Sequence, residues 1–226
     1  MELFKNTLFI NLEQRTDRLD HILQEFKKMD INGERINAIK TKSGAIGCTM
    51  SHIRCLEIAK ERNYEEVFIC EDDITFTNPE LLKQNITKFH QNLYNDKWDV
   101  LIIGGNAVPP YQQLGDFCAK ISYCQTTTGY IVKQHYYDTL LLNFRESVKN
   151  LIREPTNKIN YALDKYWTRL QTKGIWLMIT PATVTQYENY SDIENQTTNY
   201  HHLMLDMEKP WLFKPRPTQI STMNFT

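Results

Sequence analysis

The stretch VFICEDDITF, Val67–Phe76, runs four apolar residues directly into three carboxylates. The carboxylates are Glu71, Asp72 and Asp73. A short apolar run of this kind predicts a buried strand. Adjacent carboxylates at the end of such a strand repel one another unless a cation or hydrogen-bond donors neutralise them. The stretch therefore predicts a strand of a central sheet with a charged feature at its carboxyl end.

Strand-like and helix-like segments alternate around this stretch through the first 105 residues. Strands are expected at 7–12, 33–39, 66–70 and 98–105, and helices at 18–29, 45–63 and 79–93. In the second of these helices, apolar residues share one stripe: Ile46, Met50, Ile53 and Leu56. The first has its apolar residues at the same spacing: Leu19, Ile22, Leu23 and Phe26. This alternation predicts an α/β fold with a mostly parallel sheet covered by helices on both faces.

The second half of the chain is less regular. Residues 121–132 are interpreted as a strand pair or one bent strand, 136–152 and 159–171 as helices, and 175–179 and 182–187 as short strands. The prolines near the carboxyl end exclude a long helix there. We expect one domain over 1–195 and an irregular tail over 196–226 that packs on the domain or is partly mobile.

The composition narrows the function. Twenty-six Lys and Arg against 27 Asp and Glu leave a net charge of −1, which argues against general attraction to nucleic-acid phosphates. Five cysteines without a C-x-x-C pair indicate reduced thiols and a cytoplasmic location. The amino terminus is not a convincing signal peptide, and no window approaches the roughly 20 apolar residues that span a bilayer.

The three acids allow several interpretations. On extended backbone Glu71 and Asp73 point to one side and Asp72 to the other. Two carboxylates on one side can share Mg²⁺ or Mn²⁺, which prefer oxygen ligands. A solvated acidic turn before a helix near Pro79 explains the same residues. The spacing through Thr75 also fits the D-x-D-x-T loop of haloacid-dehalogenase-like phosphatases, but that chemistry needs an aspartate at the first position.

Two other segments carry candidate residues. Asn11, Arg15 and Arg18 follow the first strand, where guanidinium groups could pair with a diphosphate. An ordinary charged helix entry explains them equally. Ser51 and His52 lie in the second helix, and a lone helical histidine is more often structural than catalytic.

Six segments in order resemble glycosyltransferase family 25, the family of lipopolysaccharide sugar transferases and collagen galactosyltransferases. They are INLEQRTDR, GAIGCTMSHIRCLEIA, VFICEDDITF, WDVLIIGG, TTTGYIV and VTQYENYSDIE, within roughly residues 6–195. The likeness is greatest to versions encoded by large DNA viruses, which would place the protein in the host-cell cytoplasm or the virion. The resemblance implies a GT-A type nucleotide-sugar transferase fold, a divalent metal, usually Mn²⁺, and a UDP-sugar donor, commonly UDP-galactose.

The resemblance also implies roles for single residues. The metal is expected at Glu71 and Asp73. Donor-binding residues are expected at Asn11, Arg15, Arg18, Ser51, Asp72 and Gly129. Other matched positions are Asp17, Gly47, His52, Thr128, Tyr130, Gln186, Ser191 and Asp192. No single carboxyl-terminal histidine stands out as a further ligand, because His201 and His202 are adjacent.

Asp164 is the expected catalytic base, since it lies beside Tyr166 and Trp167, whose rings suit a sugar face. A helix-capping role for Asp164 is the alternative. The expected reaction moves galactose or glucose from a UDP-sugar to a hydroxyl group, with inversion. A collagen-like hydroxylysine, a lipid-linked glycan and a simple saccharide remain open as acceptors. A non-catalytic nucleotide-sugar or glycan-binding module and a metal-dependent phosphohydrolase remain alternative functions.

Overall fold

The computed structural model describes residues 2–191 and 196–212. Its strands are β1 (Thr7–Asn11), β2 (Gly33–Asn37), β3 (Glu66–Glu71), β4 (Ile74–Phe76), β5 (Val100–Ala107), β6 (Gln112–Gln113), β7 (Cys118–Lys120), β8 (Cys124–Lys133), β9 (Trp176–Ile179), β10 (Val184–Gln186), β11 (Asn189–Ser191) and β12 (Gln196–Thr198). Its α-helices are α1 (Thr16–Met29), α2 (Gly44–Glu61), α3 (Pro79–Asn92), α4 (Tyr137–Arg153), α5 (Lys158–Tyr161), α6 (Leu163–Tyr166), α7 (Thr168–Gln171) and α8 (His201–Leu205). Short 3₁₀ turns are η1 (Glu2–Phe4), η2 (Gln134–Tyr136) and η3 (Pro210–Leu212).

The central sheet has eight strands in the order β2-β1-β3-β8-β5-β9-β7-β6. The strands β1, β2 and β3 are mutually parallel, and so are β5 and β9. β8 lies between the two groups and pairs antiparallel with both β3 and β5, so the two groups point the same way. β7 is also antiparallel to its neighbours. The mostly parallel sheet expected from the sequence is confirmed, with β8 and β7 as the reversed strands.

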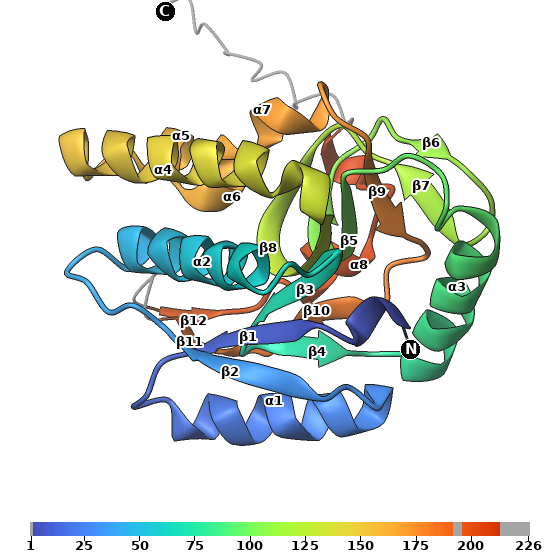
Figure 1. Ribbon diagram of the computed structural model, residues 1–226, viewed down its shortest axis with the longest axis horizontal. Coiled ribbons are helices and arrows are strands. Elements are labelled where there is room, and N and C mark those ends of the chain that lie inside the picture. The colour runs from blue at the N-terminus through green and yellow to red at the C-terminus, as the bar shows by residue number, and fades with distance from the viewer. Residues whose placement is uncertain (1, 192–195, 213–226) are drawn as a thin grey trace, which may run out of the picture.

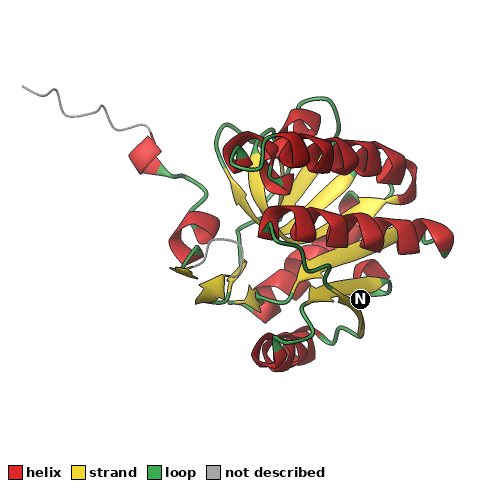
Figure 2. Ribbon diagram, turned by 90° about the vertical axis from the view of Figure 1, so that its left-hand side faces the viewer, coloured by secondary structure: helices red, strands yellow, loops and turns green. Residues whose placement is uncertain are grey.

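Helices cover both faces of this sheet. Figure 1 shows α2 and α4 side by side over one face, with α1 and α3 on the other side, and the layering is visible from the side in Figure 2. β3 alternates between the two cores: Val67 and Ile69 pack under α2 and α4, whereas Phe68 and Cys70 pack toward α1 and α3. A strand buried on both faces must be apolar at every position, which is why VFIC has no polar residue.

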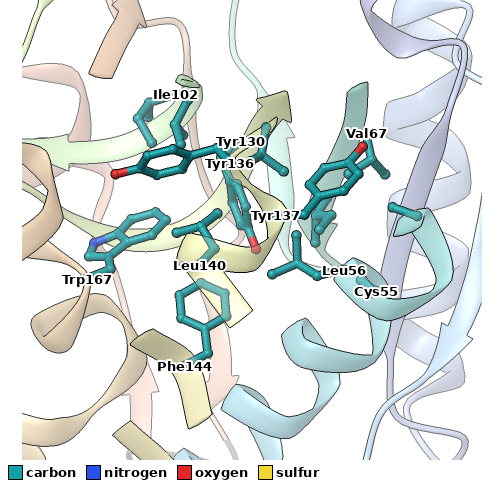
Figure 3. Packing of buried hydrophobic residues seen from close by; sticks show 14 of the residues in the cluster. Cys55, Leu56, Val67, Ile102, Tyr130, Tyr136, Tyr137, Leu140, Phe144 and Trp167 are labelled. Carbon is teal, nitrogen blue, oxygen red and sulfur yellow. The ribbon is translucent and has the colours of Figure 1, made fainter. Parts of the chain in front are cut away.

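The buried stripe of α2 differs from the expected one. Ile46, Met50 and Ile53 are only half-buried. The side facing the sheet and α4 instead contains Ser51, His52, Cys55, Leu56 and Ala59. Figure 3 shows Leu140 and Phe144 of α4 in the same buried cluster as Leu56 of α2. The expected stripe is wrong because small and polar residues occupy the buried positions of α2, and a hydrophobic pattern assigns such residues to the surface.

Two other segments depart from the sequence interpretation. Leu23, expected on the apolar stripe of α1, is 44% exposed. The helix expected over 159–171 is divided into α5, α6 and α7, and the extended backbone of Ala162, with ψ of 147°, separates α5 from α6. Of the segment 121–132, the residues from Cys124 onward form one strand, β8, and residues 121–123 precede it. No helix in the described residues is long and apolar enough to cross a membrane.

The turn that carries the acids is held by a second, small sheet. β3 ends at Glu71, and β4 then pairs antiparallel with β10. The N–H of Tyr187, just after β10, donates to the carbonyl oxygen of Asp73 at 2.6 Å. Gly129 of β8 lies beneath this turn, where a Cβ would approach Ile74 Cδ1 to 2.8 Å. The position of the turn therefore depends on β10 and β8 as well as on β3.

The described part of the carboxyl-terminal segment also packs on the sheet. β12 pairs with β11, so residues on both sides of the expected boundary at 195 pair with each other. α8 contacts β5 and β10 and buries Met204 completely. Lys209 is 2% exposed, and its Nζ donates to the carbonyl oxygens of Leu203 and Asp206, both at 2.7 Å.

We predict that Gly47→Ala destabilises the protein by about 1–3 kcal/mol, the usual cost of overpacking. A Cβ at Gly47 would lie 2.3 Å from the backbone carbonyl oxygen of Ile39, which cannot move without shifting its loop. The free energy of unfolding from chemical denaturation measures the effect. Gly129→Ala is the comparison, because there the nearest atom is the end of the Ile74 side chain and a smaller loss is expected. An equal or smaller loss for Gly47→Ala would contradict the prediction.

Candidate functional site

Polar side chains meet where β1 and β3 end. These strands are paired in parallel, with Ile10 opposite Glu71, so Asn11 and the three acids reach the same edge of the sheet (Figure 1). This is the edge at which open α/β sheets bind ligands. The side chains come from β1, α1, α2, β3 and β8.

Arg18 of α1 neutralises two of the acids. Its Nη1 donates to Asp72 Oδ1 at 3.0 Å and to Asp73 Oδ2 at 3.1 Å, and its Nη2 donates to the carbonyl oxygen of Tyr190 at 3.0 Å. Asn11 Nδ2 donates to Asp72 Oδ2 at 2.7 Å. The Arg18 side chain is only 12% exposed. A buried ion pair with this many hydrogen bonds makes the charge density of the turn tolerable.

The expected alternation of the acids fails after Glu71. Extended backbone would send Asp72 away from Asp73, but β3 ends at Glu71 and a turn follows. Because of the turn, Asp72 and Asp73 reach the same nitrogen of Arg18. Sequence spacing predicted the strand correctly but could not fix where it ends.

Glu71 lies toward α2 and β8. Its Oε1 accepts a hydrogen bond of 2.5 Å from the hydroxyl of Thr127 and lies 3.4 Å from Nε2 of His52. His52 is fully buried, and its Nδ1 is 3.0 Å from the hydroxyl of Tyr130. Thr127 and His52 thus fix the direction of the Glu71 carboxylate.

Asp164 is held next to this group by the same strand. Its Oδ2 accepts the backbone N–H of Thr126 at 3.2 Å and lies 3.4 Å from Nζ of Lys165. Thr126 has a φ of +63°, a conformation that non-glycine residues rarely adopt. Consecutive residues of β8 therefore contact Asp164 and Glu71.

The environment separates the acidities of the carboxyl groups. Burial, together with the charge of Glu71, raises the pKa of Asp73 to about 8. Burial also raises the pKa of Asp72, although Arg18 and Asn11 oppose it. Burial acts in the same direction on Glu71, but His52 and Thr127 outweigh it and its pKa lies below the ordinary value. For Arg18, burial is outweighed by Asp73 and Asp72, which raise its pKa.

The donor atoms fit a hard divalent cation. Asp73 Oδ1 and Asn11 Oδ1 are buried and make no hydrogen bond within the described residues. Unpartnered buried oxygens are costly, and carboxylate and amide oxygens are the ligands that Mg²⁺ and Mn²⁺ prefer. A divalent cation would also oppose the repulsion between Glu71 and Asp73 that favours protonation.

Three of the predicted donor-binding residues make contacts within the protein. Arg15 forms a two-pronged ion pair with Asp17, at 2.9 and 2.8 Å, and donates to the Tyr190 carbonyl at 3.2 Å. Ser51 accepts the N–H of Ile39 and donates to the Gly47 carbonyl, both at 2.8 Å.

The third, Gly129, lies between Cys70 and Gly104 in the sheet. These contacts hold the edge together, and a donor-binding role for any of the three remains a prediction.

Other expectations lie outside this group or outside the described residues. His202 packs on Trp211 with ring centroids 4.5 Å apart, and His201 is exposed. Gln186 ends β10 opposite Ile74. Asp192 lies outside the described residues.

Sequence reasoning missed Thr126, Thr127 and Cys48. The run of three threonines before an apolar strand was the available signal, because hydroxyl groups directly before a buried strand lie at a sheet edge.

We predict that Asp73→Asn raises the melting temperature at pH 8 without divalent cations. The rise should be about 2–4 °C for each kcal/mol of electrostatic destabilisation that the substitution removes. A folded-state pKa of about 8 against 3.8 means that the wild type loses stability as pH rises between these values, because the folded state holds the proton more tightly. The gain should therefore shrink toward pH 4. Thermal melts across this range test it, with the exposed Asp20→Asn as control; a gain independent of pH would contradict the stated cause.

Comparisons with known proteins agree with this architecture. The family model described as glycosyltransferase family 25 (LPS biosynthesis protein) matches residues 42–158, which is more than half of the chain. A curated relative from Anopheles gambiae, described as a glycosyltransferase 25 family member, is 25% identical over 239 residues. That match covers 82% of this chain but 38% of the relative, so the chain spans well under half of the relative's length.

Among solved structures, the chain is similar to a glycosyltransferase involved in the glycosylation of the major capsid of PBCV-1. The TM-score is 0.53 at 12% identity, and the match covers 84% of this chain and 95% of that chain. At this identity the likeness concerns the fold, which is of the GT-A type with a mixed, mostly parallel sheet between helices. From the family model that matches residues 42–158, on a fold shared with a solved glycosyltransferase, we conclude that the chain belongs to glycosyltransferase family 25.

Proposed function

We propose that the protein transfers a sugar, galactose or glucose, from a UDP-sugar to a hydroxyl group of an acceptor, and that Glu71 and Asp73 hold a divalent cation, Mn²⁺ or Mg²⁺. The observation that carries the proposal is the placement of two kinds of acid by adjacent residues of β8. Thr127 holds Glu71, and Thr126 holds Asp164. Transfer of a sugar from a nucleotide diphosphate requires a cation ligand next to a proton acceptor.

Asp164 is the proposed base. The acceptor oxygen would attack the anomeric carbon, its proton would pass to the Asp164 carboxylate, and the bond from that carbon to the UDP oxygen would break with inversion. The N–H of Thr126 and the Lys165 ammonium keep Asp164 oriented. A positioned base of this kind contributes about 10²–10⁴-fold to the rate.

The remaining residues hold the cation ligands. Arg18 and Asn11 fix Asp72, Arg18 also fixes Asp73, and Thr127 fixes Glu71. The cation, when bound, supplies charge that stabilises the departing diphosphate. Orienting contacts of this kind are as necessary as the ligands themselves, because a misdirected carboxylate binds metal weakly.

Three classes of acceptor fit the proposed reaction. A collagen-like hydroxylysine, a lipid-linked glycan and a saccharide all present the hydroxyl group that Asp164 would deprotonate. The backbones of Tyr187 and Tyr190 contact Asp73 and Arg18, and their side chains, 44% and 46% exposed, offer apolar surface for a sugar face.

The donor can be identified by incubating the protein with Mn²⁺ and a panel of UDP-sugars and measuring free UDP. Release from one donor and not from others is the expected result. Binding without turnover across donors and acceptors would instead indicate a nucleotide-sugar-binding module. Cleavage of a generic phosphate ester without preference for UDP would indicate a phosphohydrolase.

We predict that Asp73→Asn abolishes Mn²⁺-dependent binding of UDP, because the cation loses one of its two proposed carboxylate ligands. Isothermal titration calorimetry with UDP and Mn²⁺ measures the loss. Asp20→Asn on the exposed side of α1 is the control and should bind as the wild type does. An unchanged affinity in a folded Asp73→Asn variant would exclude Asp73 as a ligand.

We predict that Asp164→Asn lowers the turnover number about 10²–10⁴-fold with little change in UDP affinity, because it removes the proton acceptor and leaves the cation ligands in place. Steady-state rates and UDP titrations separate the two quantities. Asp138→Asn is a matched control, since Asp138 also lies in the first turn of a helix but is exposed and pairs with Lys60. Wild-type turnover in Asp164→Asn would assign the base elsewhere.

A further inference from the structure

We infer that Cys48, His52 and Glu71 form a second metal site, which takes a thiophilic divalent cation of the zinc class. Each residue offers one ligand atom, and the three atoms lie within 4.8 Å of one another. Among the described residues, this is the group of three whose possible ligand atoms lie this close together. The site adjoins the proposed Mn²⁺ pair but uses different chemistry, because it includes sulfur and an imidazole nitrogen.

His52 gives the strongest indication of a ligand. Its Nε2 is fully buried and has no hydrogen-bond partner within the described residues. The nearest candidate, Glu71 Oε1, is 3.4 Å away, beyond the usual range of about 2.7–3.2 Å for N–H···O bonds. A buried ring nitrogen that faces a carboxylate oxygen at this distance can share an ion with it.

The second ring nitrogen of His52, Nδ1, also supports a metal-binding role for this residue. Nδ1 of His52 lies 3.0 Å from the hydroxyl oxygen of Tyr130, which can accept the Nδ1 proton and leave the Nε2 lone pair free. Histidines that bind metals almost always donate their second ring N–H to a protein acceptor in this way. The rings of Tyr130 and His52 also stack, with centroids 5.7 Å apart, so the imidazole cannot turn away.

Cys48 completes the group from the same helix. It precedes His52 by four residues, so the two side chains lie on one face of α2, one turn apart. Thiolate, imidazole and carboxylate together suit zinc, whereas Mn²⁺ and Mg²⁺ prefer oxygen alone. On binding, the Cys48 thiol would release its proton to solvent and bind as thiolate. Three protein ligands leave one position of a tetrahedral shell for water or a phosphate oxygen.

Glu71 belongs to both proposed metal sites. Its Oε1 is already oriented by Thr127, and that orientation serves either ion. The zinc-class site rests on Cys48, His52 and Glu71, with Tyr130 orienting the His52 ring, and it does not depend on the proposed sugar transfer.

Cobalt is a direct probe, because Co²⁺ bound to a thiolate gives an intense ligand-to-metal charge-transfer absorption that oxygen ligands do not give. We expect the native protein to show this band with one Co²⁺ per chain, and Zn²⁺ to displace it. Cys48→Ala and Cys48→Ser should lose the band. Cys55→Ala is the matched control, since Cys55 lies on the same helix among apolar side chains and should keep the band.

Tyr130→Phe gives a graded test. Removing a group that only orients a metal ligand costs roughly 10–100-fold in affinity, so the band should persist but need more Co²⁺. Absence of the thiolate band in the native protein, or an equal band in folded Cys48 variants, would overturn the proposal. UDP release is not a readout in either experiment, so failure here leaves the transferase proposal standing, and failure of that proposal leaves this site standing.

Discussion

The edge of the sheet depends on the compensation of three adjacent carboxylates, of which Asp72 and Asp73 are buried. A buried charge without a partner costs several kcal/mol, so the chain after β3 can fold only if donors reach it from elsewhere. Arg18 supplies the positive charge, Asn11 and Thr127 supply hydrogen bonds, and Tyr187 holds the turn through its backbone. β1, α1, β8 and β10 must therefore all be in place before this edge has its final form.

Much of the fold could be predicted because apolar periodicity is a local property. VFIC predicts a doubly buried strand, and the strand and helix segments around it predict a parallel sheet. β8 could not be placed in this way, since periodicity does not show that this strand inserts antiparallel between β3 and β5. The buried face of α2 was also hidden, because Ser51 and His52 are polar and the fold brings them the Ile39 N–H and the Tyr130 hydroxyl as partners.

The sequence predicted the candidate site in part, as it did the fold. Asn11 and Glu71 could be placed together because the ends of parallel strands meet at one edge. A turn at the acids was one of the interpretations that the sequence left open, but the sequence did not indicate that Asp72 and Asp73 share Arg18. The threonine run before the apolar residues of β8 was a local signal for Thr127, but the partner of its hydroxyl, Glu71, could not be predicted. Cys48 had no local signal, since only tertiary packing sets its thiol beside a carboxylate.

The two threonines of β8 have one further consequence. Consecutive Cα atoms are about 3.8 Å apart, a spacing fixed by covalent geometry and insensitive to side-chain packing. Because Thr126 holds Asp164 and Thr127 holds Glu71, the offset between the two acids is set by a single peptide unit. Substitutions elsewhere at the site can then change which molecules bind there while both acids keep their anchors on neighbouring residues of β8.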